Sequence, residues 1–199
     1  RFTTEGLQEV IEEFSKITGN TQKAEKINTI FTEALEHADN YNEFVKKWVN
    51  AFFSKYGLIV LNMDDSRLKR AFIPVMQREI TQQISQTLVT TTQESLEKLH
   101  NFTPQAYVRD INLFYIKDHS RERLYKDGNL YKVNNSNLQF TEQEIIQHLN
   151  AYPERFSPNV VMRPIFEEYT LPNIAYIGGG GELAYWLERK RQFQAFNVF

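Results

Sequence analysis

GLIVLNMDDSRLKR, residues 57–70, is the stretch that decides the expected fold. A run of apolar or glycine positions over 57–61 leads to two aspartates and a serine, and a helical pattern follows. This order predicts a buried strand feeding a helix, which is the repeating unit of a parallel α/β sheet. Asp64 and Asp65 would then lie at the carboxyl end of the strand, where open α/β sheets bind ligands. Alternatively, Asp64, Asp65 or Ser66 simply caps the helix.

The segments on either side of this stretch differ in their patterns. Residues 1–57 contain three segments with amphipathic helical spacing, which predict a small helical layer. Residues 58–199 read as α/β and include a long helix over 66–99, which Pro74 should break or kink near its start. The distal half of that helix has a thin apolar stripe, as in a helix that pairs with another helix.

After the long helix, the spacing of the apolar residues changes from a helical to a strand-like pattern. Residues 111–133 contain two β-prone runs around Asp127-Gly128, which predict a tight β-hairpin. Thr141 and, three residues later, Glu144 then form the capping box of a short helix.

Composition excludes several classes of protein. The 199 residues carry a net charge of −2 and no cysteine, so there is no overall basic field and no disulfide or thiolate zinc site. No apolar run approaches the roughly 20 residues of a membrane span, and the amino terminus lacks the zones of a signal peptide. We therefore expect a cytoplasmic protein that binds neither nucleic acid nor membrane. The four histidines lack metal-site spacing, so no metal is expected.

A second stretch, IAYIGGGGELAYW (residues 174–186), sets four glycines between a short strand-like run and a helix. The backbone N–H groups of such a turn can hold a phosphate. However, neither common phosphate-binding glycine pattern is complete, and Glu182 in the first helical turn would repel an anion. Two interpretations stay open. Either the glycines let a ligand approach the backbone while Glu182 faces an amine or hydroxyl, or they form a purely structural turn.

Arg163 is the other exceptional residue, because it lies between an apolar pair and Pro164. Its stem would be enclosed there, and its planar guanidinium suits a carboxylate or a phosphate. An internal partner, Glu167 or Glu168, is the alternative.

Two segments, GLIVLNMDDSRLKRAFIPVMQREI (57–80) and SPNVVMRPIFEEYTLPNIAYIGGGGELAYWLERK (157–190), together resemble the bacillithiol biosynthesis cysteine-adding enzyme family. The order Arg-Pro, Leu-Pro and glycine run-Glu-x-x-Tyr-Trp carries most of the resemblance. It implies an α/β fold: a predominantly helical fragment of a Rossmann-like core, with a helical insertion of the connecting-peptide type and a β-hairpin. The family's coiled-coil region is associated with dimers, so a homodimer is expected of the longer parent protein, of which this chain looks like the middle.

The resemblance also implies an activity. Family members are ligases that add cysteine to glucosaminyl-malate, forming an amide in the last step of bacillithiol synthesis, and ATP is expected to activate the cysteine carboxylate. The family's nucleotide-site-like motif lies upstream of this chain, so the chain alone is expected to be inactive.

The resemblance further suggests the candidate substrate-binding residues, with no catalytic residue and no metal ligand assigned. Arg163 is expected to bind the malyl carboxylate, and Glu182 the sugar amine or hydroxyls. Related sequences often have proline at Gly180, so this turn is expected to be more flexible. Tyr185 and Trp186 are expected to pack behind the turn. The full set of candidates is Arg163, Gly178, Gly179, Gly180, Gly181, Glu182 and Asp64.

The competing hypothesis is a non-catalytic, mostly helical interaction or oligomerisation module. Such a module has no need of the glycine run, and its Arg163 would face an internal glutamate. The ligase hypothesis instead places Arg163 beside a pocket.

Overall fold

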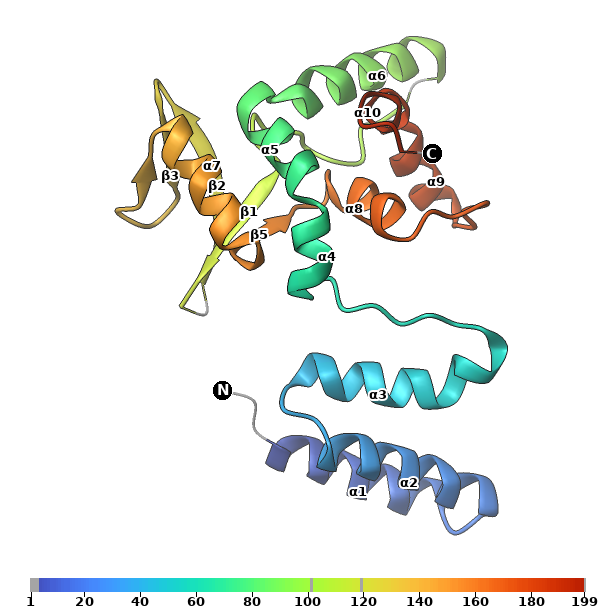
Figure 1. The fold of residues 1–199 in the computed structure, drawn as a ribbon. Helices are drawn as coiled ribbons and strands as arrows, with labels where there is room; N and C mark the ends of the chain where they lie inside the picture. The colour runs from blue at the N-terminus through green and yellow to red at the C-terminus, as the bar shows by residue number, and fades with distance from the viewer. Residues whose placement is uncertain (1–3, 101, 119, 199) are drawn as a thin grey trace. The chain divides into compact units, whose positions relative to one another are not determined.

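The computed structural model describes residues 4–100, 102–118 and 120–198, and its contacts divide the chain into two compact units (Figure 1). Unit 1 covers residues 1–63 and unit 2 covers residues 64–199. The sequence pattern instead predicts a division after residue 57.

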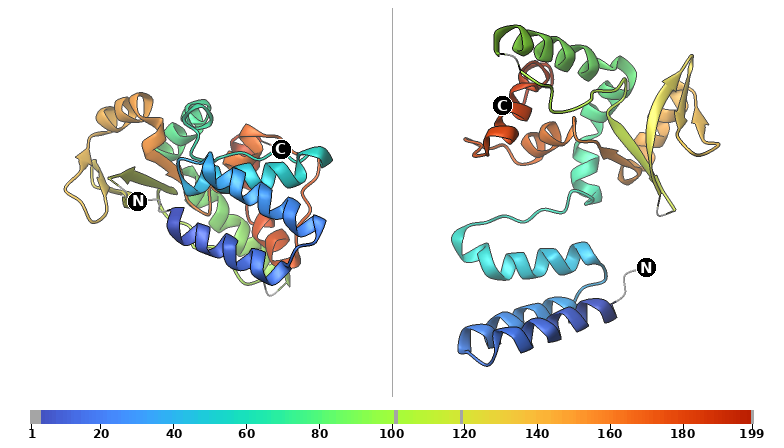
Figure 2. Two further views of the ribbon diagram at one scale, coloured as in Figure 1. Left: turned by 90° about the horizontal axis from the view of Figure 1, so that it is seen from below. Right: turned by 180° about the vertical axis from the view of Figure 1, so that it is seen from behind.

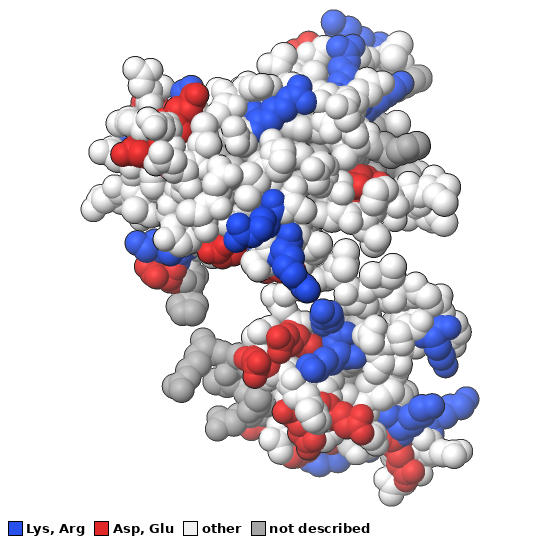
Figure 3. Space-filling view, in the orientation of Figure 1, with Lys and Arg blue, Asp and Glu red and all other residues white. Residues whose placement is uncertain are grey.

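Unit 1 is the expected layer of three helices, α1 (Thr4–Thr18), α2 (Gln22–Glu36) and α3 (Tyr41–Phe53), followed by the 3-10 turn η1 (Ser54–Tyr56). Thr21 caps α2, because its hydroxyl accepts a hydrogen bond from Ala24 N at 3.2 Å. The layer is held by aromatic side chains: the Phe31 ring meets Trp48 and Phe52 edge-on, with centroids 5.6 and 5.8 Å away. Charged side chains of both signs are interspersed on its visible face (Figure 3).

The strand expected over 57–61 is not formed, so this prediction is wrong. Gly57 adopts a left-handed conformation (φ 83°) that ends η1, and the residues after it run without regular structure. Leu58, Ile59 and Leu61 are exposed, Ile59 by 61%. A strand needs a neighbouring strand to satisfy its backbone N–H and C=O groups. Within the described residues this segment pairs with none.

Unit 2 begins with three helices in place of the single long helix predicted over 66–99. They are α4 (Ser66–Ala71), α5 (Ile73–Gln82) and α6 (Ile84–His100). The first break falls at Phe72, just before Pro74, as the missing N–H of proline predicts. The second break, at Gln83 (φ 51°), was not predicted. It forms because the buried Glu79 carboxylate accepts hydrogen bonds from the Ser85 hydroxyl at 2.6 Å and from Ser85 N at 3.4 Å, and so caps the start of α6.

The apolar stripe of these helices is buried inside unit 2. Phe72, Met76 and Ile80 are fully buried in the main core, and Phe72 meets the Phe166 ring edge-on at 4.9 Å. The first half of the predicted helix therefore presents no free stripe to a partner.

Five strands form one antiparallel sheet in the order β4-β3-β2-β1-β5. The bounds are β1 (Leu113–Lys117), β2 (Ser120–Asp127), β3 (Leu130–Val133), β4 (Gln139–Phe140) and β5 (Phe156–Pro158). The predicted hairpin joins β2 to β3. Asp127 pairs with Leu130 across a two-residue loop, in which Gly128 has a positive φ of 58°.

Further helices complete unit 2. Helix α7 (Glu142–Ala151) lies over one face of the sheet and has the predicted Thr141–Glu144 capping box (Figure 2). The remaining elements follow in order: η2 (Pro153–Arg155), α8 (Arg163–Thr170), α9 (Gly180–Leu187) and α10 (Lys190–Ala195). Residues 171–179 link α8 to α9 without a strand, so the strand-like expectation for 174–177 is also wrong. Ile174 and Ile177 are almost fully exposed, and the described residues offer this run no pairing strand.

Candidate functional site

Helix α8 presents two of the charged residues singled out by the sequence. Arg163 is its first residue, and Glu167 follows one turn later, so the two side chains share a face. Arg163 Nη1 lies 3.0 Å from Glu167 Oε2. Both side chains are 35% exposed, so the pair is accessible to a ligand.

Helix α9 and the loop before it bring further side chains to the same place. Glu182 Oε1 accepts three hydrogen bonds: from Arg163 Nη2 at 3.0 Å, Tyr176 Oη at 2.7 Å and Trp186 Nε1 at 2.9 Å. The Tyr176 and Trp186 rings are stacked with their centroids 3.8 Å apart. We call Arg163, Glu167, Tyr176, Glu182 and Trp186 the Arg163 cluster.

The glycine run shapes this cluster at one position in particular. A Cβ on Gly178 would come within 3.2 Å of both Glu182 Cγ and Tyr176 Cε1, so only glycine allows those side chains their observed approach. A Cβ on Gly179, Gly180 or Gly181 would meet open space. Gly179 is the N-cap of α9 and Gly180 its first residue. Gly178 therefore serves packing, while the other three glycines leave the surface beside Glu182 uncovered.

The two glutamates of the Arg163 cluster differ in acidity. Hydrogen bonds from Tyr176 and Trp186, and then from Arg163, hold the pKa of Glu182 below its ordinary value. Burial raises the pKa of Glu167, and neighbouring carboxylates add to that rise, although Arg163 opposes it. Such a separation between two nearby carboxylates is typical of sites that assign them different roles. Glu182 is thus the more firmly ionised group and Glu167 the better proton acceptor.

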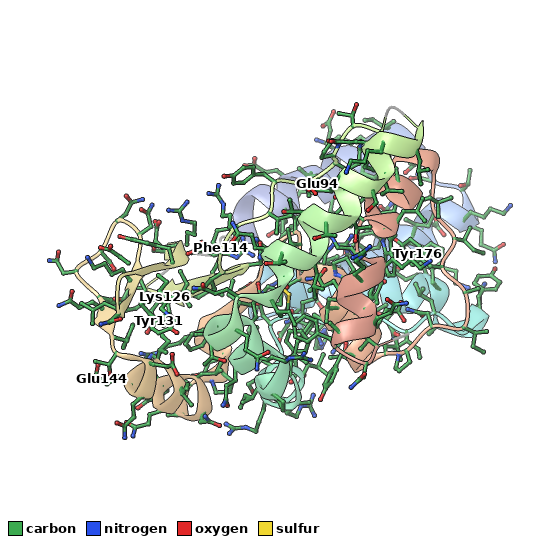
Figure 4. The ribbon with its side chains drawn as sticks, turned by 90° about the horizontal axis from the view of Figure 1, so that it is seen from above. Glu94, Phe114, Lys126, Tyr131, Glu144 and Tyr176 are labelled. Atoms are coloured by element: carbon green, nitrogen blue, oxygen red, sulfur yellow. The ribbon has the colours of Figure 1, made fainter. Side chains whose placement is uncertain are left out.

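An apolar groove of about 520 Å³ borders the Arg163 cluster. Tyr176 and Trp186 line it, together with Leu183, Leu187 and Phe193. Tyr176 lies on the side of unit 2 away from Tyr131 and Glu144 of the sheet region (Figure 4). The candidate site is therefore formed by α8, α9 and their connecting loop, and the hairpin takes no part in it.

Asp64 is placed differently from the other sequence candidates. Its carboxylate lies 2.9 Å from Lys69 Nζ, a buried ammonium that also donates to Glu154 O at 3.1 Å. Helix α4, which begins just after Asp64, starts in a different part of unit 2 from the α8–α9 loop (Figure 1). Asp65 is the N-cap of α4, in agreement with the capping alternative. The structure thus brings Arg163, the glycine run and Glu182 together but leaves Asp64 apart.

Arg163 has internal glutamate partners and is also accessible, so it combines features of both sequence interpretations. The sequence did not predict the place of Tyr176 in this cluster or the hydrogen bond that Trp186 donates. For Trp186 a signal existed, since it follows Glu182 by four residues and so shares its helix face. Tyr176 reaches Glu182 through an irregular loop that no periodicity describes. Tyr185 is buried, as expected, and its hydroxyl donates to Val160 O.

Across the described residues, no group of three or more metal-binding side chains could hold a metal ion. Among the described helices, none is both long and apolar enough to cross a membrane.

Comparison with known proteins gave consistent matches over the whole chain. A family model described as "Bacillithiol biosynthesis BshC, N-terminal Rossmann-like domain" matches residues 1–199. Among curated proteins, those named putative cysteine ligase BshC are similar to this chain: 42% identical over 100% of the chain in Flavobacterium johnsoniae, and 43% identical over 98% in Christiangramia forsetii. The chain spans only 37% and 36% of the length of these relatives.

Proposed function

Because this chain belongs to the bacillithiol biosynthesis BshC family and matches its N-terminal Rossmann-like domain, we propose that it is part of an amide-forming cysteine ligase. In this proposal, cysteine is joined through its carboxylate to the amine of glucosaminyl-malate. The chain spans about 37% of its relatives' length, so the activity is assigned to the complete gene product, and the 199-residue chain alone is expected to be inactive. Such a ligase is expected in the cytoplasm. A homodimer of the complete protein stays a prediction.

The observation that carries this proposal is the charge balance of the Arg163 cluster. One guanidinium lies between two carboxylates, so the cluster is net negative when both glutamates are ionised. No donor among the described residues is hydrogen-bonded to Glu182 Oε2, because the three that reach this carboxylate all bond to Oε1. A substrate ammonium or amine therefore suits this site, with its N–H donating to Glu182 Oε2.

Arg163 takes a different role in this arrangement from the one the sequence suggested. Its Nη1 and Nη2 are already bonded to Glu167 and Glu182, and a malyl carboxylate would be a third anion around one cation. We therefore propose that Arg163 orients the two glutamates toward the amine and does not bind the malate.

Glu167 is proposed as the proton acceptor. An amine attacks an acyl carbon only through its free electron pair, so a substrate ammonium must first lose a proton. The raised pKa of Glu167 fits that task, whereas the lowered pKa of Glu182 makes it a weaker base. When the C–N bond forms, the nitrogen gives up one further proton, and the group that activates the cysteine carboxylate leaves with its electron pair.

ATP is the proposed source of that activation, but the Arg163 cluster does not fit its phosphates. Glu182 lies in the first turn of α9 and Glu167 lies nearby, so anions would be repelled from the glycine turn. No residue of this chain is assigned to the nucleotide.

The proposal is tested by mass spectrometry with the complete gene product, glucosaminyl-malate, cysteine and ATP. Wild type is expected to form the cysteinyl amide. Glu182→Gln is expected to raise the KM for the amine substrate, and Glu167→Gln to lower kcat. Glu94→Gln is the matched control, because Glu94 is an exposed residue of α6 (Figure 4). No product from folded wild type, or unchanged kinetics in both cluster variants, would reject the assignment.

A further inference from the structure

A series of buried polar side chains lies behind the start of α8. Glu79 comes from α5, Asn112 precedes β1, and Asn159 lies between β5 and α8. Glu79 and Asn112 are fully buried, and Asn159 is 8% exposed. Buried polar groups are costly unless they are hydrogen-bonded, so a linked set of three in one core needs an explanation.

The three side chains are bonded in series. Glu79 Oε1 accepts from Asn112 N at 3.1 Å and from Asn112 Nδ2 at 2.9 Å. Asn112 Oδ1 in turn accepts from Asn159 Nδ2 at 3.1 Å. Asn159 Oδ1 accepts from the backbone N–H groups of Val161 and Met162, at 2.8 and 3.2 Å. The series therefore ends on the backbone of the turn that enters α8.

That turn carries Arg163. Arg163 N donates to Asn159 O at 2.9 Å, and Met162, the N-cap of α8, makes no capping hydrogen bond with its own side chain. Asn159 thus supplies the acceptors that a capping side chain normally supplies. Arg163 contacts two separate carboxylates at 3.0 Å each, and a small rotation of this turn would lengthen both contacts.

We propose that Glu79, Asn112 and Asn159 are positioning residues that fix the turn before α8 and thereby aim Arg163 at Glu167 and Glu182. None of the three belongs to the Arg163 cluster. The importance of this Arg163 orientation for catalysis rests on the proposed function. The positioning itself does not rest on it, and the test of the positioning needs no substrate.

The test uses the indole N–H signals of the 199-residue chain in ¹⁵N NMR. The chain has two tryptophans: Trp186 donates to Glu182, whereas Trp48 lies in unit 1 and serves as an internal control. In Asn159→Ser, the hydroxyl can still accept a backbone N–H but is too short to reach Asn112. The Trp186 signal is expected to move by more than its line width, in the direction given by Arg163→Lys, while the Trp48 signal stays in place.

Asn150→Ser is the matched control, since Asn150 is an exposed residue of α7 that bonds only within its own helix. It should leave both indole signals unchanged. An unmoved Trp186 signal in folded Asn159→Ser would overturn the proposal. If that variant does not fold, Asn159→Asp replaces it, because the aspartate keeps the two backbone contacts but sets a carboxylate oxygen, in place of the donor, against Asn112 Oδ1. Unfolding of both variants would assign the series to global stability and also overturn the positioning role.

Discussion

Substitutions at two glycines of the run, Gly178 and Gly180, are predicted to have opposite effects on stability. Gly180 is the first residue of α9, where proline is favoured because its fixed φ suits the helix and its missing N–H has no helical partner. Gly179 before it has φ −69° and ψ 167°, an extended conformation that a following proline tolerates. Gly180→Pro should therefore stabilise unit 2 by about 0.4–1 kcal/mol, mainly by restricting the unfolded chain.

Gly178→Ala should act in the other direction. Its Cβ would lie 3.2 Å from Glu182 Cγ and from Tyr176 Cε1, so both side chains must move by a few tenths of an ångström. Those side chains are bonded to each other at 2.7 Å, and the move strains that contact. Overpacking of this kind costs about 1–3 kcal/mol.

Thermal unfolding measures both substitutions. With about 2–4 °C per kcal/mol for a domain of this size, Gly180→Pro should raise the Tm by up to about 4 °C, and Gly178→Ala should lower it by about 2–12 °C. A Trp48→Phe background makes Trp186 fluorescence the reporter of unit 2. Equal shifts in both variants, or a loss of stability in Gly180→Pro, would refute this account of the glycine run.

Three further predictions concern the core, a helix cap and the cluster. Phe72→Ala should lower the free energy of unfolding by about 3–5 kcal/mol in urea titrations, because the ring is fully buried against Phe166, and Phe72→Leu should lose much less. Thr141→Ala should cost about 1 kcal/mol through the lost cap of α7, while Thr141→Ser keeps it; equal losses in both would contradict the capping role. In ¹³C carboxyl NMR titrations, Glu182 should titrate below its ordinary value of 4.5 and Glu167 above it. Glu182 then contributes stability above pH 4.5 that is lost as the pH falls through its folded pKa, whereas the contribution of Glu167 is lost as the pH rises through its own. The reverse order of midpoints would contradict the assigned roles.

Features that depend on a few neighbouring residues were predictable. Three such features formed as the sequence indicated: the Thr141–Glu144 box, the hairpin turn at Gly128 and the end of the helical layer at Gly57. In each case the signal and the structure it specifies lie within one turn of chain. The break before Pro74 belongs to the same class.

Features that depend on distant partners were not predictable. The apolar runs 57–61 and 174–177 have strand composition, but strand formation also requires a neighbour, and the described residues supply none. The break at Gln83 depends on the Glu79 carboxylate turning back onto Ser85. The candidate site shows the same division: Arg163 and Glu182 stood out in the sequence, whereas Tyr176 joins them only through the path of an irregular loop.

The most direct test of the central claim is an NMR titration of the 199-residue chain with glucosaminyl-malate, and in parallel with its N-acetylated form, in which the amine is blocked. If the Arg163 cluster binds the amine, the Trp186 indole signal moves with the free amine only, the Trp48 signal stays in place, and Glu182→Gln abolishes the response. Equal responses to both compounds, or none from Trp186 at saturating ligand, would contradict the claim that this cluster recognises the substrate amine.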